Sequence, residues 1–147
     1  MKRGKIEAIA ISRRKGIRKR PVMSAMVLRN HGLKGDAHAG VWHRQVSFLA
    51  REAIDRAKLR GLNVGFGDFA ENIATSGVDW PSLSPGTRVR LGKEVVVEIT
   101  QIGKECHARC AIYRVAGGCI MPREGVFAKV LMGGRIQCGD EVIILPS

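Results

Sequence analysis

Residues 86–103, GTRVRLGKEVVVEITQIG, carry the pattern that decides the fold class. The stretches 86–92 and 94–103 are rich in β-branched residues, and a Gly-Lys pair joins them, which predicts two consecutive strands with a tight turn. The stretch 140–145 echoes the first of them, because a glycine and a small polar residue again precede β-branched side chains. This echo is typical of small barrels and argues against a helical bundle.

The elements around this stretch are short. We predict further strands over residues 5–12, 22–28, 46–49, part of 67–77 and 140–145, and short helices over 50–61, 107–116 and 125–134. The helix 50–61 has the clearest helical pattern, because Ala53, Ile54 and Ala57 form an apolar stripe and Gly61 provides a cap. The sequence therefore predicts a mostly β or α+β protein, a small closed or nearly closed β-barrel with a few short helices. The 147 residues are expected to form a single domain, 1–147.

The chain is strongly basic. It has 25 Lys and Arg residues against 13 Asp and Glu residues, which gives a net charge of +12 and predicts an anionic partner. The densest run, residues 13–20, is expected to be an exposed loop. Only seven aromatic side chains (one Tyr, two Trp and four Phe) are present and no RNA-binding signature is found, which disfavours a nucleic-acid partner.

No segment of the sequence has the 18–20 or so consecutive apolar residues that a membrane-spanning helix needs. The N-terminal residues 1–16 are basic, but Glu7 interrupts their short apolar stretch, so they do not resemble a signal peptide. We therefore expect a cytoplasmic protein that does not bind a membrane. In that compartment thiols stay mostly reduced, and disulfides are not expected.

The long stretch 30–45 shows no periodicity and contains glycines at positions 32, 35 and 40, which predicts a loop. Loops of this length in small domains are usually functional or disordered, and the two histidines beside a tryptophan favour function. His43 and Arg44, with Gln45, place polar groups directly before an apolar strand, as at the rim of a ligand pocket.

Three of the four cysteines lie within residues 105–119, ECHARCAIYRVAGGC. Cys106, Cys110 and Cys119 with a histidine would complete a zinc site, but the first two have C-x₃-C spacing and no second cysteine pair follows. Burial in the core is the ordinary fate of a cysteine, and Cys138 before the last strand is expected to be structural. Cys106 differs because Lys104, His107 and Arg109 surround it, and nearby cations stabilise a reactive thiolate.

The order and spacing of several short motifs resemble the MOSC domain, the C-terminal domain of molybdenum cofactor sulfurases, over about residues 5–145. The motifs are GLKGDAHAGVWHRQVSFL, FAENI and ITQIGKECHARC followed by GGCIMPREGVFAKVLMGGRIQCGDEV. The resemblance, closest to stand-alone bacterial members, implies a β-barrel related to a barrel domain of pyruvate kinase. It also implies a function in handling sulfur or the molybdenum cofactor, molybdopterin. It leaves open whether the chain is a carrier or part of a sulfurtransferase or oxidoreductase.

The same resemblance assigns roles to individual residues. The family's hallmark cysteine follows a Thr-Gln strand end and corresponds to Cys106, which would carry a persulfide or ligate the molybdenum of the cofactor. Here Ile102 and Gly103 stand where the family often has Pro-Arg. The catalytic candidates are Cys106, His43 and His107, and the candidate contacts to the anionic cofactor are Arg44, Gln45, Lys104, Arg109, Arg123, Asp36 and Asn72.

The implied partners are this anionic cofactor and a cysteine desulfurase or molybdopterin-biosynthesis protein. Two other functions stay open at this point, a structural zinc-thiolate module and a basic nucleic-acid-binding domain.

Overall fold

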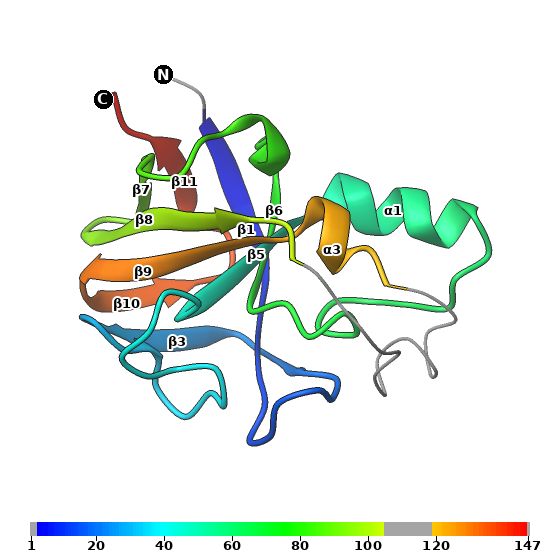
Figure 1. Cartoon of the computed structure of the whole chain (residues 1–147), viewed down its shortest axis with the longest axis horizontal. Helices are drawn as coiled ribbons and strands as arrows, with labels where there is room; N and C mark the ends of the chain where they lie inside the picture. The colour runs from blue at the N-terminus through cyan, green and yellow to red at the C-terminus, as the bar shows by residue number, and fades with distance from the viewer. Residues whose placement is uncertain (1–2, 105–118, 147) are drawn as a thin grey trace.

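A closed seven-stranded β-barrel forms the centre of the computed structural model, which describes residues 3–104 and 119–146 (Figure 1). Around the barrel the order is β1 (Arg3–Ile11), β6 (Ile73–Ser76), β5 (Val46–Ala50), β9 (Val126–Met132), β8 (Val95–Ile102), β7 (Arg88–Leu91) and β11 (Glu141–Ile144). Antiparallel pairing of β11 with β1 closes the ring, with Arg3 opposite Ile143. The expected barrel class is confirmed.

The stretch that predicted the barrel supplies two neighbouring strands. In the antiparallel β7–β8 hairpin Val89 lies opposite Val97 and Leu91 opposite Val95, and all four side chains are buried. The two segments that echo each other, 86–92 and 140–145, contain β7 and β11, which pair with each other. Alternating apolar residues on consecutive strands thus identified the barrel wall correctly.

A smaller sheet lies against the barrel and consists of β10 (Gly134–Gln137), β3 (Ser24–Leu28) and β4 (Gly32–Leu33). The predicted strand 22–28 is divided, because β2 (Arg20–Val22) pairs with β1 whereas β3 joins the smaller sheet. The segment 30–45 is a loop as expected, apart from the two residues of β4.

Helices are few in the described residues. α1 (Arg51–Leu59) buries Ala53, Ile54 and Ala57 as predicted, and Gly61 beyond its end has a φ of +96°. The other helical elements are the 3-10 turn η1 (Trp80–Ser82) and α3 (Met121–Glu124). No helix in residues 3–104 or 119–146 is long and apolar enough to cross a membrane.

One expectation about secondary structure is wrong, and the expected exposure of the basic run fails at a single residue. Residues 125–134 were predicted to be a helix but form β9, which pairs with β5 on one side and β8 on the other. Apart from Lys129 the strand is apolar, and the consecutive residues Val126, Phe127 and Ala128 are all buried, so its sequence lacks the strict alternation that marks a half-buried strand. The basic run 13–20 is also not entirely exposed, because the side chain of Lys19 is fully buried. The predicted helix 107–116 lies outside the described residues.

Candidate functional site

The side chain of Gln101 organises the polar groups at the end of β8. A register shift between Ile99 and Gln101 bulges the strand here, and bulges of this kind re-aim side chains. Gln101 Oε1 accepts hydrogen bonds from His43 Nε2 at 3.0 Å and Arg44 Nε at 3.1 Å. Thr100 Oγ1 contacts the His43 carbonyl and also the Phe127 carbonyl on β9. The loop before β5, which carries His43 and Arg44, and the end of β8 therefore lie together.

The end of β8 is also fixed to α3. Gly103 has a φ of +68°, a left-handed conformation that favours glycine. Its N–H donates to the Gly125 carbonyl at 2.6 Å, and the Lys104 N–H donates to the Pro122 carbonyl at 3.1 Å. A side chain at position 103 would place its Cβ 2.5 Å from the Pro122 oxygen. This close approach and the positive φ explain why position 103 holds a glycine.

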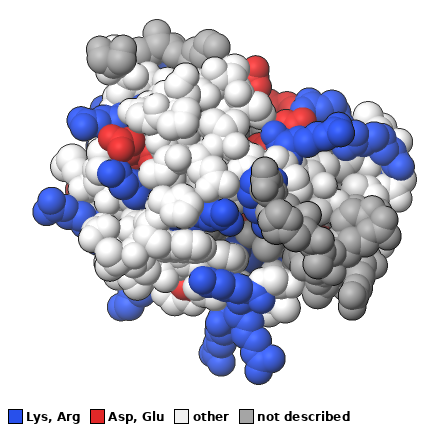
Figure 2. Space-filling model, viewed as in Figure 1, with Lys and Arg blue, Asp and Glu red and all other residues white. Residues whose placement is uncertain are grey.

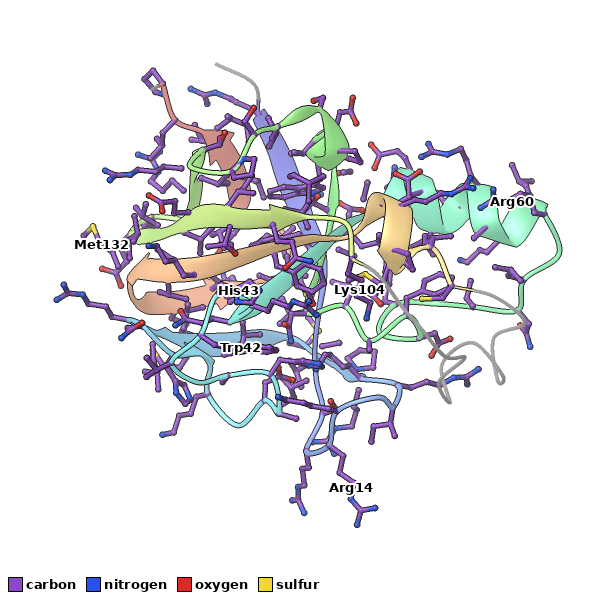
Figure 3. All side chains as sticks on the ribbon, in the orientation of Figure 1. Arg14, Trp42, His43, Arg60, Lys104 and Met132 are labelled. Atoms are coloured by element: carbon purple, nitrogen blue, oxygen red, sulfur yellow. The ribbon has the colours of Figure 1, made fainter. Side chains whose placement is uncertain are left out.

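Aromatic faces hold cations near this site. Lys15 Nζ lies 4.4 Å from the centre of a Trp42 ring, and Arg44 Cζ lies 5.8 Å from Trp42 and 5.3 Å from the Phe127 ring. Figure 3 shows Trp42 and His43 beside each other, with Lys104 beyond the end of β8. Within the described part of the chain, no carboxylate lies within 4.0 Å of Lys15, Arg44 or Lys104. Aromatic rings orient Lys15 and Arg44 without neutralising them, so the charge of these two side chains is available to an anion.

A buried ionic network lies next to these cations. Lys19 Nζ is 2.8 Å from Asp36 Oδ1, and both side chains are fully buried. The same nitrogen lies 3.1 Å from Ser12 Oγ and 2.8 Å from His38 Nδ1. Asp36 also accepts hydrogen bonds from the N–H groups of Ser12 and His38. The network therefore ties the loop that carries His38 to β1 and to the residue before β2.

The network shifts the pKa values of its members. Burial lowers the pKa of Lys19, and the Asp36 carboxylate opposes this effect. Burial acts to raise the pKa of Asp36, but Lys19 and the hydrogen bonds from Ser12 and Asn72 outweigh it and hold that pKa below its ordinary value. The pKa of His38 falls to about 4, first through burial and then through the charge of Lys19. Lys15 and Lys104 lower it further, so their charges act on the same imidazole.

Glu71 and Asn72 lie in the interior behind this network. Glu71 accepts hydrogen bonds from the N–H groups of Gly67 at 2.7 Å and Phe69 at 3.1 Å. Burial nevertheless raises the pKa of Glu71 to about 7. Asn72 joins β1 to β5, because its Nδ2 donates to the Ala10 carbonyl and its Oδ1 accepts from Ser47 N and Oγ. Asn72 is thus occupied by bonds that hold the barrel together.

The other predicted site residues differ in their surroundings. Gln45 is fully buried; it donates to Asn30 Oδ1 and accepts from the N–H of Val130. Arg123 is exposed on α3 and follows Pro122, whose carbonyl accepts a hydrogen bond from the Lys104 N–H. Cys106, His107, Arg109 and Cys110 lie outside the described residues. Cys138 is half-buried and its Sγ lies 3.7 Å from the Val22 carbonyl.

Sequence reasoning did not identify Lys19, His38 or Ser12. Lys19 was hidden in a charge run whose ordinary fate is solvation, and Ser12 was the last residue of a predicted strand. His38 stands two positions after Asp36 in the motif GDAHAG, and that spacing was the available signal.

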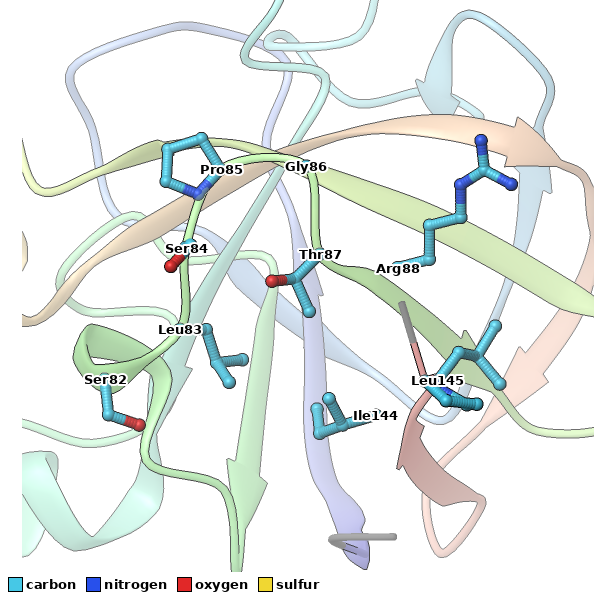
Figure 4. Close-up of a pocket in the computed structure, with 10 residues that line it drawn as sticks. Ser82, Leu83, Ser84, Pro85, Gly86, Thr87, Arg88, Ile144 and Leu145 are labelled. Atoms are coloured by element: carbon cyan, nitrogen blue, oxygen red, sulfur yellow. The ribbon is translucent and has the colours of Figure 1, made fainter.

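The surface offers two further features. Lys and Arg side chains are spread over the face in Figure 2, with few carboxylates between them. A hollow of about 690 Å³ lies elsewhere, lined by Ser82–Arg88 and Ile144–Pro146 (Figure 4). Its one charged side chain, Arg88, is paired with Glu98 at 3.6 Å, and none of its lining residues belongs to the site around Gln101. Outside residues 1–2, 105–118 and 147, no three His, Cys, Asp or Glu side chains gather as a metal site would require.

Comparison with known proteins identifies both a family and a fold. The family model of the MOSC domain matches residues 35–143. The YuaD protein from Bacillus subtilis has a similar structure, with a TM-score of 0.78 and 18% identity over 95% of this chain and 94% of that chain.

YiiM from Geobacillus stearothermophilus gives a TM-score of 0.73 at 18% identity over 97% of this chain and 75% of its own. YiiM from Escherichia coli gives 0.66 at 17% identity, over 97% and 70%. At these identities the structures show a shared fold. No curated protein matches the chain.

Proposed function

Because the chain belongs to the MOSC domain family, whose members include the C-terminal domains of molybdenum cofactor sulfurases, we propose that it carries sulfur as a persulfide on Cys106 and holds an anionic, phosphorylated pterin beside it. The single observation that supports an anionic ligand is the group of unneutralised cations Lys15, Arg44 and Lys104 near the end of β8. Cys106 follows Lys104 by two positions in the sequence.

The sulfur transfer needs no external oxidant. The Cys106 thiolate attacks the outer sulfur of a donor persulfide, such as that of a cysteine desulfurase. The donor's sulfur–sulfur bond breaks, the donor cysteine leaves as a thiolate, and Cys106 becomes the persulfide. Cations favour the thiolate form that attacks, and Lys104 supplies one of them.

His43 is suited to take the thiol proton in this proposal. Its Nε2 donates to Gln101 Oε1, so the neutral ring keeps its lone pair on Nδ1. His43 is also exposed, which leaves that nitrogen accessible to a reacting group. We assign His107 the same role as an alternative, and Arg109 and Arg123 as further anion contacts.

The described side chains fit the phosphate end of the molybdenum cofactor, because Arg44 offers a planar set of N–H donors and Lys15 and Lys104 offer point charges. When bound, the cofactor supplies a metal centre that accepts a thiolate ligand, and Cys106 is the residue that we assign to it. Asp36, Gln45 and Asn72, which we predicted to contact the cofactor, act in this proposal by supporting the loops that carry Arg44 and His38.

The experiment is intact-protein mass spectrometry after incubation with a cysteine desulfurase and cysteine. We expect the wild-type protein to gain the mass of one sulfur atom, which a reducing thiol then removes. Cys106→Ser should gain none, whereas Cys138→Ser, the matched control at a half-buried cysteine, should gain as much as the wild type. Equal sulfur loading of Cys106→Ser and the wild type would rule out Cys106 as the carrier. Repeating the incubation with molybdopterin tests cofactor binding separately.

A further inference from the structure

The buried network fixes the hydrogen-bonding role of His38. Ser12 Oγ donates its only proton to the Arg14 carbonyl at 2.9 Å. In the contact between Ser12 Oγ and Lys19 Nζ, the lysine must therefore be the donor. Asp36 Oδ1 accepts a second lysine proton. The third proton of the ammonium group points to the remaining neighbour, His38 Nδ1, at 2.8 Å.

This arrangement selects one tautomer of the imidazole. Because Nδ1 accepts from Lys19, the neutral ring carries its proton on Nε2. Nε2 is separated from Nδ1 by one ring carbon and makes no hydrogen bond to residues 3–104 or 119–146. The side chain is 23% exposed, so this N–H is a donor without a partner in the described protein.

The donor lies in a cationic environment. The charges of Lys15 and Lys104 both act on the His38 ring, whose pKa of about 4 keeps it neutral at physiological pH. The Trp42 ring lies parallel to the His38 ring, with 6.5 Å between centres and 7° between planes, and Trp42 Nε1 donates to the His38 carbonyl at 2.7 Å. His38 is therefore held in place from two sides, next to cations that attract an anion.

We propose that His38 binds an oxoanion through its Nε2–H, acting as the uncharged hydrogen-bond donor of the same anion site that Lys15, Arg44 and Lys104 surround. This assignment rests on the proposed function, and it specifies the ligand group as a phosphate oxygen that can only accept. A ligand that presents a hydroxyl or ammonium proton at this position meets no acceptor lone pair on Nε2. The field of the surrounding cations is also unfavourable to such a proton. Lys19 and Asp36 are positioning residues that hold the tautomer.

The first test measures the tautomer directly in the wild-type protein. Nitrogen-15 NMR of the histidine rings should show His38 neutral and protonated on Nε2 between pH 5 and pH 8, while a freely titrating histidine changes charge in this range. Adding inorganic phosphate should shift the Nε2 and Nε2–H signals of His38. A ring protonated on Nδ1, or charged at pH 7, overturns the assignment.

The second test measures phosphate affinity by the same titration in variants. His38→Leu, which lacks the donor, should bind phosphate about tenfold or more weakly, as expected for a hydrogen bond to a charged group. His38→Gln retains an amide donor and should remain within a few-fold of the wild type. His31→Leu is the matched control, because His31 is half-buried in the same long loop and contacts none of these cations in the described residues.

The outcomes separate this inference from the proposed function. If Arg44→Leu weakens phosphate binding but His38→Leu does not, the anion site stands and the role of His38 is wrong. If the wild type binds no phosphate, both the anion site and the His38 assignment fail, whereas sulfur loading of Cys106 is judged by its own experiment.

Discussion

Replacing Lys19 with methionine provides a strong test of the buried network. Lys19 and Asp36 lie 2.8 Å apart with both side chains fully buried. The Lys19→Met substitution keeps an apolar chain of similar length but leaves the carboxylate without its counter-ion. Removing one partner of a buried ion pair costs about 3–5 kcal/mol of unfolding free energy. Asp36 keeps its two backbone N–H donors, so we expect the lower end of this range.

The double variant Lys19→Met/Asp36→Asn separates the charge effect from the loss of packing. Asparagine retains one oxygen that can accept from the backbone of Ser12 or His38, and no charge remains in the interior. Replacing a whole buried pair with neutral groups is often close to neutral in stability. The double variant should therefore recover at least about half of the 3 kcal/mol or so that Lys19→Met loses.

The pH dependence of the unfolding free energy tests the ion pair independently. In the wild type the pKa of Asp36 is held below its ordinary 3.8, so its stabilising contribution is present above that pH and is lost as the pH falls through the lowered pKa. Without Lys19, burial raises that pKa instead. The Lys19→Met variant should then approach wild-type stability in acid and lose stability as the pH rises through the raised pKa.

Urea unfolding at pH 4 and pH 7, followed by fluorescence of the buried Trp80, measures these effects. A Lys19→Met variant within about 1 kcal/mol of the wild type at pH 7 would refute the ion pair as described. A double variant no more stable than Lys19→Met would show that packing, and not charge, explains the loss.

Three further substitutions test other parts of the site. Burial raises the pKa of Glu71 to about 7 from 4.5, so its contribution to stability is complete below pH 4.5 and is lost as the pH rises through 7. Urea unfolding should therefore show about 2.5 kcal/mol less stability at pH 8 than at pH 5, and Glu71→Gln should flatten this difference. Asn72→Ala removes bonds between β1 and β5 and should cost about 2–4 kcal/mol in urea unfolding, a cost that unchanged midpoints would contradict. Gly103→Ala places a Cβ 2.5 Å from the Pro122 oxygen, so we expect a lower melting temperature and weaker phosphate binding. Wild-type values for both would contradict the tight junction of β8 with α3.

Much of the barrel was predictable because its signals are local. The β7–β8 hairpin follows from β-branched runs and a turn within 18 residues, and α1 follows from three apolar residues at helical spacing. β9 was not predictable in this way. Its partners β5 and β8 are far apart in sequence and pair with its two edges, and only that context distinguishes this short, mostly apolar run as a strand and not a helix.

The candidate site was partly predictable from motif order. The motifs made His43, Arg44 and Asp36 candidates, but the sequence could not show that Gln101 holds the first two or that Asp36 faces inward. Those facts depend on a loop before β5 meeting the bulge in β8, 57–58 residues away. Residue type and spacing indicate which chemistry is available, whereas the fold decides which groups meet.

The basic run 13–20 shows most clearly what net charge leaves undecided. A net charge of +12 predicts an anionic partner but counts every lysine and arginine alike. The fold gives two members of this run different surroundings: Lys19 is directed into a buried network and Lys15 lies over the face of Trp42. Because Lys19 is neutralised by Asp36 while Lys15 is not, one lysine sets the tautomer of His38 and the other adds to the field that an anion meets. Reversing the charge of Lys15 should therefore weaken phosphate binding without lowering stability, whereas replacing Lys19 should lower stability first.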